Sequence, residues 1–190
     1  SKPDAVQDFA NQLFGGSKTS EGELPYELLR RADYSVRRYP AVSVAEVAYD
    51  VRPEGYDMLG SYTGGFNEND AKMQPFLPSI ITVPRSGGGA KTMTWPVSRA
   101  EDDLPGSRVV KTRRARELTV ACLVFPQAAT EDAVQYWARE LEQKLAADGL
   151  AGAPGHETNY VVAQYDAIFS VGDRRNEVWI PLAPGHPWDN

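Results

Sequence analysis

The chain carries eight segments in which apolar and polar residues alternate, or in which β-branched and aromatic residues dominate, as is typical of β-strands. They cover residues 34–37, 42–45, 76–83, 92–98, 109–113, 118–125, 160–165 and 177–182. The first two flank Pro40 and are expected to pair as a hairpin, and the fifth and sixth are also expected to pair. Residues 118–125 are apolar on both faces, which predicts a central strand.

Two further segments have the signals of a helix at both ends. The first has Pro53 and an acidic residue in its first turn and stops at Gly64. The second begins after Thr130, a good N-cap, and stops at Gly149. The apolar faces consist of Tyr56, Leu59 and Tyr62 in the first helix and of Val134, Trp137, Leu141 and Leu145 in the second.

The order strand, strand, helix, strand, strand occurs twice, with an offset of about 80 residues. We expect residues 33–100 and 107–182 to form two ββαββ repeats in a single domain that spans residues 1–190. Residues 1–23 are an expected N-terminal extension and residues 183–190 an expected tail. Two such units can close their antiparallel strands around a common centre with both helices outside, which gives an α+β fold.

Composition restricts the possible partners. A length of 190 residues with 42% hydrophobic residues suits one domain with a full core, and a net charge of -6 argues against a nucleic-acid partner. The local exception is a set of basic residues whose alternating spacing predicts the solvent face of a strand. These are Arg108, Lys111, Arg113, Arg114 and Arg116. We expect a monomer.

The single cysteine, Cys122, lies within the apolar strand 118–125, which predicts a buried and unreactive thiol and a reducing compartment. No stretch approaches the ~20 apolar residues of a membrane span. The expected location is the cytoplasm, or a plastid or other organelle if a leader was removed. A short helical turn is expected at Phe9, Leu13 and Phe14.

Several familiar chemical motifs are absent or incomplete. The glycines 87–89 precede Ala90 and Lys91 but lack the spacing of a phosphate loop, and a strand follows them rather than a helix. His156 and His186 have no second His or Cys near them in sequence, so no metal site is expected. Nothing in the pattern favours a catalytic acid–base pair.

Residues 174–180, with the sequence RRNEVWI, join two arginines and an amide to an apolar strand. Polar groups at the entry of such a strand suit an anionic ligand. The alternative is that the arginines are solvated and cover apolar atoms with their stems.

This segment, with Ala163-Gln164-Tyr165-Asp166 before it, resembles the C-terminal signature of the SOUL family of haem-binding proteins. Residues 34–39, YSVRRY, are similar to the family's opening strand, and residues 13–15 resemble an element near the start of its smaller members. The resemblance implies a distorted eight-stranded antiparallel β-barrel flanked by two helices. It also implies binding of haem and free-base porphyrins, often without strong ligation of iron.

The resemblance implies a binding site with two parts. Met58, Leu59 and Tyr62 offer an apolar face for the ring, and Arg174 and Arg175 offer cations for its propionates. Alternatively, Leu59 and Tyr62 only fasten the helix to the sheet, and Arg175 serves the structure by bonding a carbonyl or an acid such as Asp166 or Asp173. The family's MTxPV segment is degraded at residues 72–75, whereas residues 91–97 fit it in letters but lie later, on the next expected strand.

These observations predict a soluble tetrapyrrole carrier or buffer that is not an enzyme. Two alternatives remain open at this point. The first is an effector-sensing or protein-interaction domain, because the repeated pattern also resembles the drug-sensing domains of bacterial regulators. The second is an enzyme that acts on the tetrapyrrole, such as a dechelatase.

Overall fold

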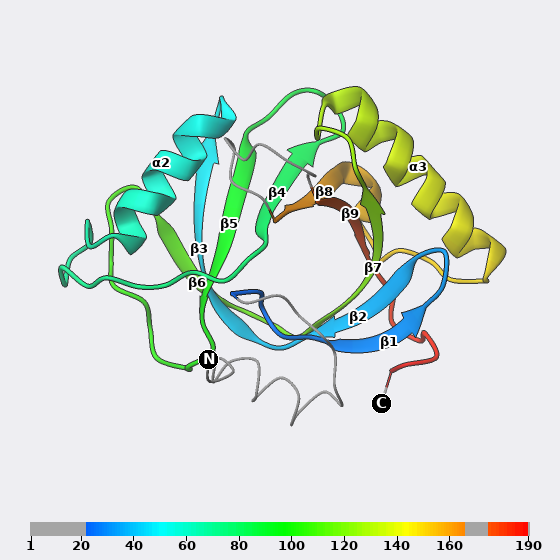
Figure 1. The fold of residues 1–190 in the computed structure, drawn as a ribbon, viewed down its shortest axis with the longest axis horizontal. Helices are drawn as coiled ribbons and strands as arrows, with labels where there is room; N and C mark the ends of the chain where they lie inside the picture. Colours follow the sequence, from blue (N-terminus) through cyan, green and yellow to red (C-terminus); the bar gives the residue numbers. More distant parts are fainter. Residues whose placement is uncertain (1–21, 166–174, 190) are drawn as a thin grey trace.

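The computed structural model describes residues 22–165 and 175–189. Within them, nine antiparallel strands form one strongly curved sheet, and helices α2 and α3 cover one of its faces (Figure 1). The helices are α2 (Arg52–Thr63) and α3 (Glu131–Ala147), with a short 3-10 helix η1 (His156–Thr158). The strands are β1 (Glu27–Arg31), β2 (Ser35–Tyr39), β3 (Val42–Tyr49), β4 (Ser79–Pro84), β5 (Lys91–Ser98), β6 (Lys111–Ala115), β7 (Leu118–Phe125), β8 (Asn159–Gln164) and β9 (Asn176–Pro181).

The strand order is β1-β2-β7-β9-β8-β4-β5-β3-β6. The order of strands is repeated on the two sides of the β4–β8 pair. Counted outwards from this pair, β4-β5-β3-β6 on one side corresponds to β8-β9-β7-β2 on the other. Each half of the sheet therefore ends in a strand that comes from the other half of the chain: β6 pairs with β3, and β2 pairs with β7. This is the arrangement that two units of equal element order produce when they exchange their first strands.

This exchange makes two predicted pairings wrong. Residues 34–37 and 42–45 do not form a hairpin, since β2 pairs with β1 and β7 while β3 pairs with β5 and β6. The strands predicted at 109–113 and 118–125 are β6 and β7, and they too pair with other strands. Alternation identifies a strand and its faces, but it carries no information about the partner.

The α+β class and the two flanking helices are confirmed, whereas the detail of the barrel is not. The sheet has nine strands rather than eight, and no ladder within the described residues joins its edge strands β1 and β6. The additional strand is β1, whose sequence ELLRR does not alternate and whose register with β2 shifts between Leu28 and Arg30. The strand β7, predicted as central, lies between β2 and β9.

The two faces of the sheet carry separate cores. The outer face packs against the helices, with Leu59 and Tyr62 of α2 and Leu141 and Leu145 of α3 in one buried cluster. The inner, concave face carries a second cluster that includes aromatic residues. Its buried members are Leu24, Tyr26, Tyr39, Val42, Val44, Val120, Cys122, Ala163, Tyr165 and Trp179.

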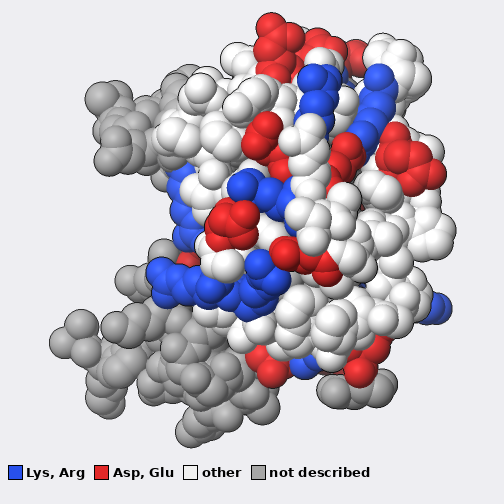
Figure 2. Space-filling view, turned by 90° about the vertical axis from the view of Figure 1, so that its right-hand side faces the viewer, with Lys and Arg blue, Asp and Glu red and all other residues white. Residues whose placement is uncertain are grey.

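Helix α3 forms as the sequence predicts. The Thr130 side chain accepts a hydrogen bond from the amide of Ala133, and two acids follow it in the first turn, where they favour the positive end of the helix. The face that the spacing predicts is buried, although Trp137 is only partly covered and stacks on Phe125. On the face of the molecule that includes α3, acidic and basic side chains are interspersed rather than segregated (Figure 2).

Candidate functional site

The C-terminal signature enters a buried polar cluster on the inner face of the sheet. We define this cluster as Arg37, Tyr39, Tyr165, Glu177 and Trp179. Arg37 donates to both carboxylate oxygens of Glu177, at 2.7 and 2.8 Å. The Tyr165 hydroxyl and the Trp179 indole donate to the Oε1 atom of the same carboxylate, at 2.8 and 3.0 Å. Glu177, with 0% exposure, is therefore fully satisfied in an apolar surrounding.

Arg175 is attached to this cluster from one side. It donates to Glu177 at 3.2 Å and to the buried Glu23 at 2.6 Å, and its guanidinium lies 3.8 Å from the centre of the Tyr165 ring. Asp166 and Asp173, which the sequence suggested as structural partners of Arg175, lie outside the described residues, as do Arg174 and the turn expected at Phe9, Leu13 and Phe14. Arg175 thus pairs with two acids other than those considered from the sequence, namely Glu23 and Glu177.

The electrostatics of the cluster keep Glu177 charged. Burial alone would raise its pKa, but the hydrogen bond and charge of Arg37, with the further bond from Trp179, hold the pKa below its usual value. Burial raises the pKa of Tyr39 and of Tyr165, which keeps both phenols neutral. It also raises the pKa of the Cys122 thiol, and this cysteine is buried as predicted.

The three residues predicted on α2 differ in how accessible they are. Leu59 and Tyr62 have exposed fractions of 0% and 1%, and the Tyr62 hydroxyl donates to the carbonyl of Pro105 at 2.7 Å. Met58 is half-buried at the edge of the same core. In this arrangement only Met58 of the three lies within reach of a molecule outside the core.

The structure does not bring Arg175 to these α2 residues, because they lie on opposite faces of the sheet. The two regions are nevertheless linked at one point. Tyr56 of α2 donates to the side chain of Gln164 at 2.9 Å, and Gln164 is the last residue of β8, directly before Tyr165 of the buried polar cluster. Tyr56 also contacts Trp95 of β5, with ring centres 6.0 Å apart.

A groove of about 480 Å³ lies on the outer face where the N-terminal ends of α2 and α3 converge. We call it the helix groove. Arg52 spans it at one end by donating to the carbonyl of Ala129 at 3.1 Å. Its polar rim includes Asp50, Arg52, Lys91 and Glu131. The apolar lining includes Val51, Ile81, Val83, Ala129, Val134, Tyr160 and Val162.

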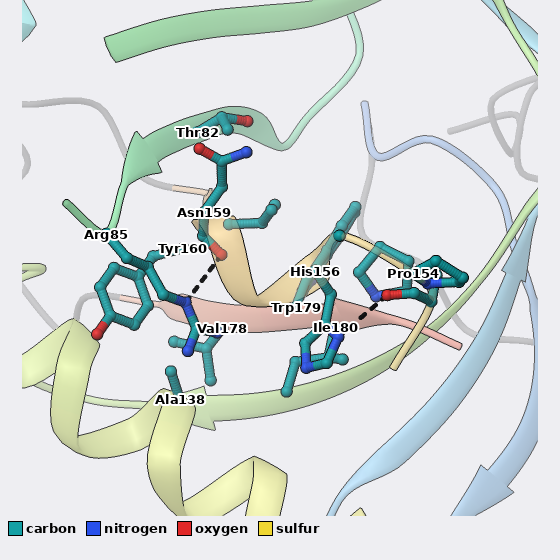
Figure 3. A pocket seen from close by; sticks show the side chains of 14 residues that line it. Thr82, Arg85, Ala138, Pro154, His156, Asn159, Tyr160, Val178, Trp179 and Ile180 are labelled. Carbon is teal, nitrogen blue, oxygen red and sulfur yellow. Dashed lines mark hydrogen bonds between the residues drawn. The ribbon is translucent and has the colours of Figure 1, made fainter. Parts of the chain in front are cut away.

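A smaller hollow of about 230 Å³ lies near the start of β8, beside α3 (Figure 3). Its two basic side chains are already engaged. Arg85 donates to the carbonyl of Asn159 at 3.2 Å and to Glu142 at 2.7 Å, and the ring of His156 contacts the carbonyl of Ala153 at 3.0 Å. This hollow therefore offers few free polar groups to a ligand.

Sequence reasoning missed most of the polar residues described above. The position of Arg52 was weakly indicated by the sequence, because a cation directly before Pro53 must lie at the start of the predicted helix. Glu177 lay within the RRNEVW signature, but nothing in the sequence marked it or Glu23 as buried, because a carboxylate buried against arginines is indistinguishable in sequence from a solvated one. Within the described residues there is no group of three His, Cys, Asp or Glu side chains suited to a metal ion. No described helix is long and apolar enough to cross a membrane.

Comparison with solved structures shows the class of fold. The C-terminal domain of EcmrR superposes with a TM-score of 0.53 at 12% identity, covering 83% of this chain and 97% of that one. EcmrR in its DNA complex gives 0.54 at 10% identity, with 79% and 57% covered. An uncharacterized conserved protein from Listeria innocua gives 0.51 at 11% identity, with 78% and 92% covered. At these identities the likeness concerns the fold alone.

The family model described as SOUL heme-binding protein matches residues 21–181, which is most of the chain. The protein therefore belongs to the SOUL heme-binding protein family. No curated protein matches the chain.

Proposed function

We propose that this protein binds haem and free-base tetrapyrroles in the helix groove and acts as a carrier or buffer. The observation that carries the proposal is the groove itself, in a member of a haem-binding family. Its volume of about 480 Å³ is within the range of small-molecule sites, and its apolar lining is mostly aliphatic with two aromatic rings, those of Tyr49 and Tyr160. Such a surface suits the flat apolar body of a porphyrin.

The rim of the groove suits the propionates of the same molecule. Arg52 and Lys91 supply cations, and the groove lies at the N-terminal ends of both helices, which carry partial positive charge. Asp50 and Glu131 at the same rim repel an anion, so they restrict where the propionates lie. A bound porphyrin would therefore turn its acidic edge towards Arg52 and Lys91.

The five residues predicted from the family resemblance take different roles in this proposal. Met58 is not among the residues that line the helix groove, so it takes no contact with the ligand there. Arg174 lies outside the described residues and is proposed as a propionate contact on the family resemblance alone. Leu59 and Tyr62 support the helix from beneath. Arg175 positions the start of β9 through its bonds to Glu23 and Glu177.

The groove as described contains no His, Cys or Met side chain that could ligate iron. Ring contacts and propionate contacts then dominate binding, and these are common to haem and to the iron-free ring. The single buried cysteine also fits the reducing environment of a cytoplasmic carrier. The likeness to EcmrR concerns the fold alone, so it does not favour the effector-sensing alternative.

Titration of the protein with haemin and with iron-free protoporphyrin tests this proposal. We expect both ligands to quench tryptophan fluorescence and to shift their Soret bands, with dissociation constants within about threefold of each other, which corresponds to about 0.7 kcal/mol. A protein that binds haemin at least about tenfold more tightly, a difference of ~1.4 kcal/mol, relies on iron ligation and contradicts the proposal.

A further inference from the structure

A second hollow, of about 560 Å³, lies on the inner face of the sheet, opposite the helix groove. We call it the inner hollow. Aliphatic side chains of β3, β4 and β8 form its walls, and residues 113–118, where β6 passes into β7, form one side of its rim. The apolar lining includes Leu24, Tyr39, Val42, Val44, Ile80, Pro96, Ala115, Leu118, Val161, Trp179 and Pro181.

The floor of the inner hollow is aromatic and rigid. Tyr39 stacks on Trp179 with ring centres 4.9 Å apart and an angle of 30° between the planes. Both residues belong to the buried polar cluster, where the Tyr39 hydroxyl accepts from Arg37 and the Trp179 indole donates to Glu177. Their polar ends are thus turned into the cluster, and the stacked rings offer apolar surface to the hollow.

The carboxylate of Glu177 is not available to a ligand in this hollow. Its Oε1 atom accepts from Arg37, Tyr165 and Trp179, and its Oε2 atom accepts from Arg37 and Arg175. A cationic ligand would have to displace Arg37, which is itself 4% exposed. The charge preference of the inner hollow is therefore determined at its rim.

The rim carries three arginines and two acids, and four of these five charges are engaged. Glu46 bonds Thr94 and Arg113, and Glu117 lies 3.7 Å from Arg38. Arg114 donates to the carbonyls of Ala41, Arg99 and Ala100. Only Arg116 makes no hydrogen bond or ion pair within the described part of the chain. Arg114 bonds only neutral oxygens, so the rim is net positive, and Arg116 carries the guanidinium that is free to pair with a ligand.

We propose that the inner hollow is a second ligand site, which takes an amphipathic anion with a compact apolar body and one carboxylate or phosphate that pairs with Arg116. The apolar body lies on the Tyr39–Trp179 stack between the walls formed by Val44, Ile80 and Val161. The size of the hollow accommodates a body of the order of one fused aromatic system or a medium alkyl chain. This site is separate from the helix groove and does not depend on the tetrapyrrole proposal.

The test uses 1-pyrenebutyrate as the probe, with the neutral 1-pyrenebutanol as its matched partner, and calorimetry at low salt as the measurement. We expect the parent protein to bind the carboxylate about fivefold more tightly than the alcohol, a difference of about 1 kcal/mol. Arg116→Ala should abolish this preference while it leaves binding of the alcohol unchanged. Arg139→Ala, which removes an exposed arginine on α3, is the control and should leave both affinities unchanged.

A second variant tests the location of the apolar body. Ile80→Phe places a larger side chain in the inner hollow and should weaken both probes at least tenfold, whereas haemin binding stays as in the parent. If Ile80→Phe folds poorly, Arg116→Ala still tests the proposal, provided that its thermal melting and haemin binding are those of the parent. Absence of binding of either probe by the parent, an equal effect of Arg139→Ala, or displacement of pyrenebutyrate by saturating haemin would each overturn the proposal.

Discussion

Arg37 and Glu177 are joined by two hydrogen bonds although their strands, β2 and β9, are not neighbours, because β7 lies between them. The ion pair therefore ties three strands across the inner face of the sheet. Glu177 belongs to the C-terminal signature and Arg37 to the opening strand, so the two most family-like segments of the chain meet at this bond.

Removal of either partner should destabilise the protein, but by different amounts. Glu177→Gln leaves Arg37 buried without an acid and should lower the free energy of unfolding by about 3–5 kcal/mol. Arg37→Met should cost less, because Glu177 keeps Arg175, Tyr165 and Trp179 as donors. Urea denaturation measures both. If Arg37→Met costs as much as Glu177→Gln or more, the remaining donors to Glu177 do not compensate for the loss of Arg37.

The same carboxylate should make stability depend on pH in the acid range. Arg37 and Trp179 hold its folded-state pKa below the usual value of a glutamate despite its burial, so it contributes stability that is fully present above the unfolded pKa and is lost as the pH falls through the folded pKa. The difference in unfolding free energy between the parent and Glu177→Gln should thus be largest at pH 7 and shrink below about pH 4. Urea titrations at several pH values test this, and a constant difference would contradict it.

Substitution of the two arginines of the signature should separate an effect on stability from an effect on porphyrin binding. Arg175→Ala loses its bonds to Glu23 and Glu177 and should lower the unfolding free energy by about 1–2 kcal/mol, with little change in porphyrin affinity. Arg174→Ala should weaken binding of a porphyrin and leave the melting temperature unchanged.

A porphyrin with esterified propionates is the control for this pair, since it should bind both variants as it binds the parent. If both variants melt earlier and yet bind the free acid and the ester as the parent does, the motif is structural and the role given to Arg174 is wrong.

The rim of the helix groove can be tested in the same way. Arg52→Ala and Lys91→Ala should each weaken protoporphyrin binding by about three- to tenfold at low salt, and less at high salt, because exposed charges are screened. The dimethyl ester should be insensitive to both changes. Arg139→Ala again serves as the control, and an effect of that variant as large as the other two would attribute the losses to overall charge.

A carrier should return its ligand unchanged. Incubation of the protein with a zinc porphyrin should leave the absorption spectrum constant after binding is complete. Protein-dependent appearance of the free-base spectrum, or loss of the Soret band, would support the enzymatic alternative instead.

Much of the fold was predictable from the sequence, since local signals define its elements. These signals depend only on residues a few positions apart in the chain. Examples are the turn residues Ser86–Gly89, the cap Thr130 and the alternation in β5 and β8. Partners were not predictable, because Val36 pairs with Ala121 across a separation that no local pattern encodes. The candidate site was predictable to the same extent, in its local pattern but not in its contacts. The apolar stripe of α2 was found, but Leu59 and Tyr62 are buried, and burial depends on what packs above them.

The exchange of β2 and β6 between the two halves of the sheet has a consequence for how the chain folds. Residues 33–100, made alone, would lack β7 and β6 as neighbours for β2 and β3, and would expose two long unpaired edges. During synthesis β2 can pair with β1 at once, but it joins the rest of the sheet only after β7 has been added, and such long-range closure slows folding. We therefore expect that neither half folds by itself and that the protein unfolds as one cooperative unit. We also expect the nascent chain to need protection from aggregation until β9 emerges.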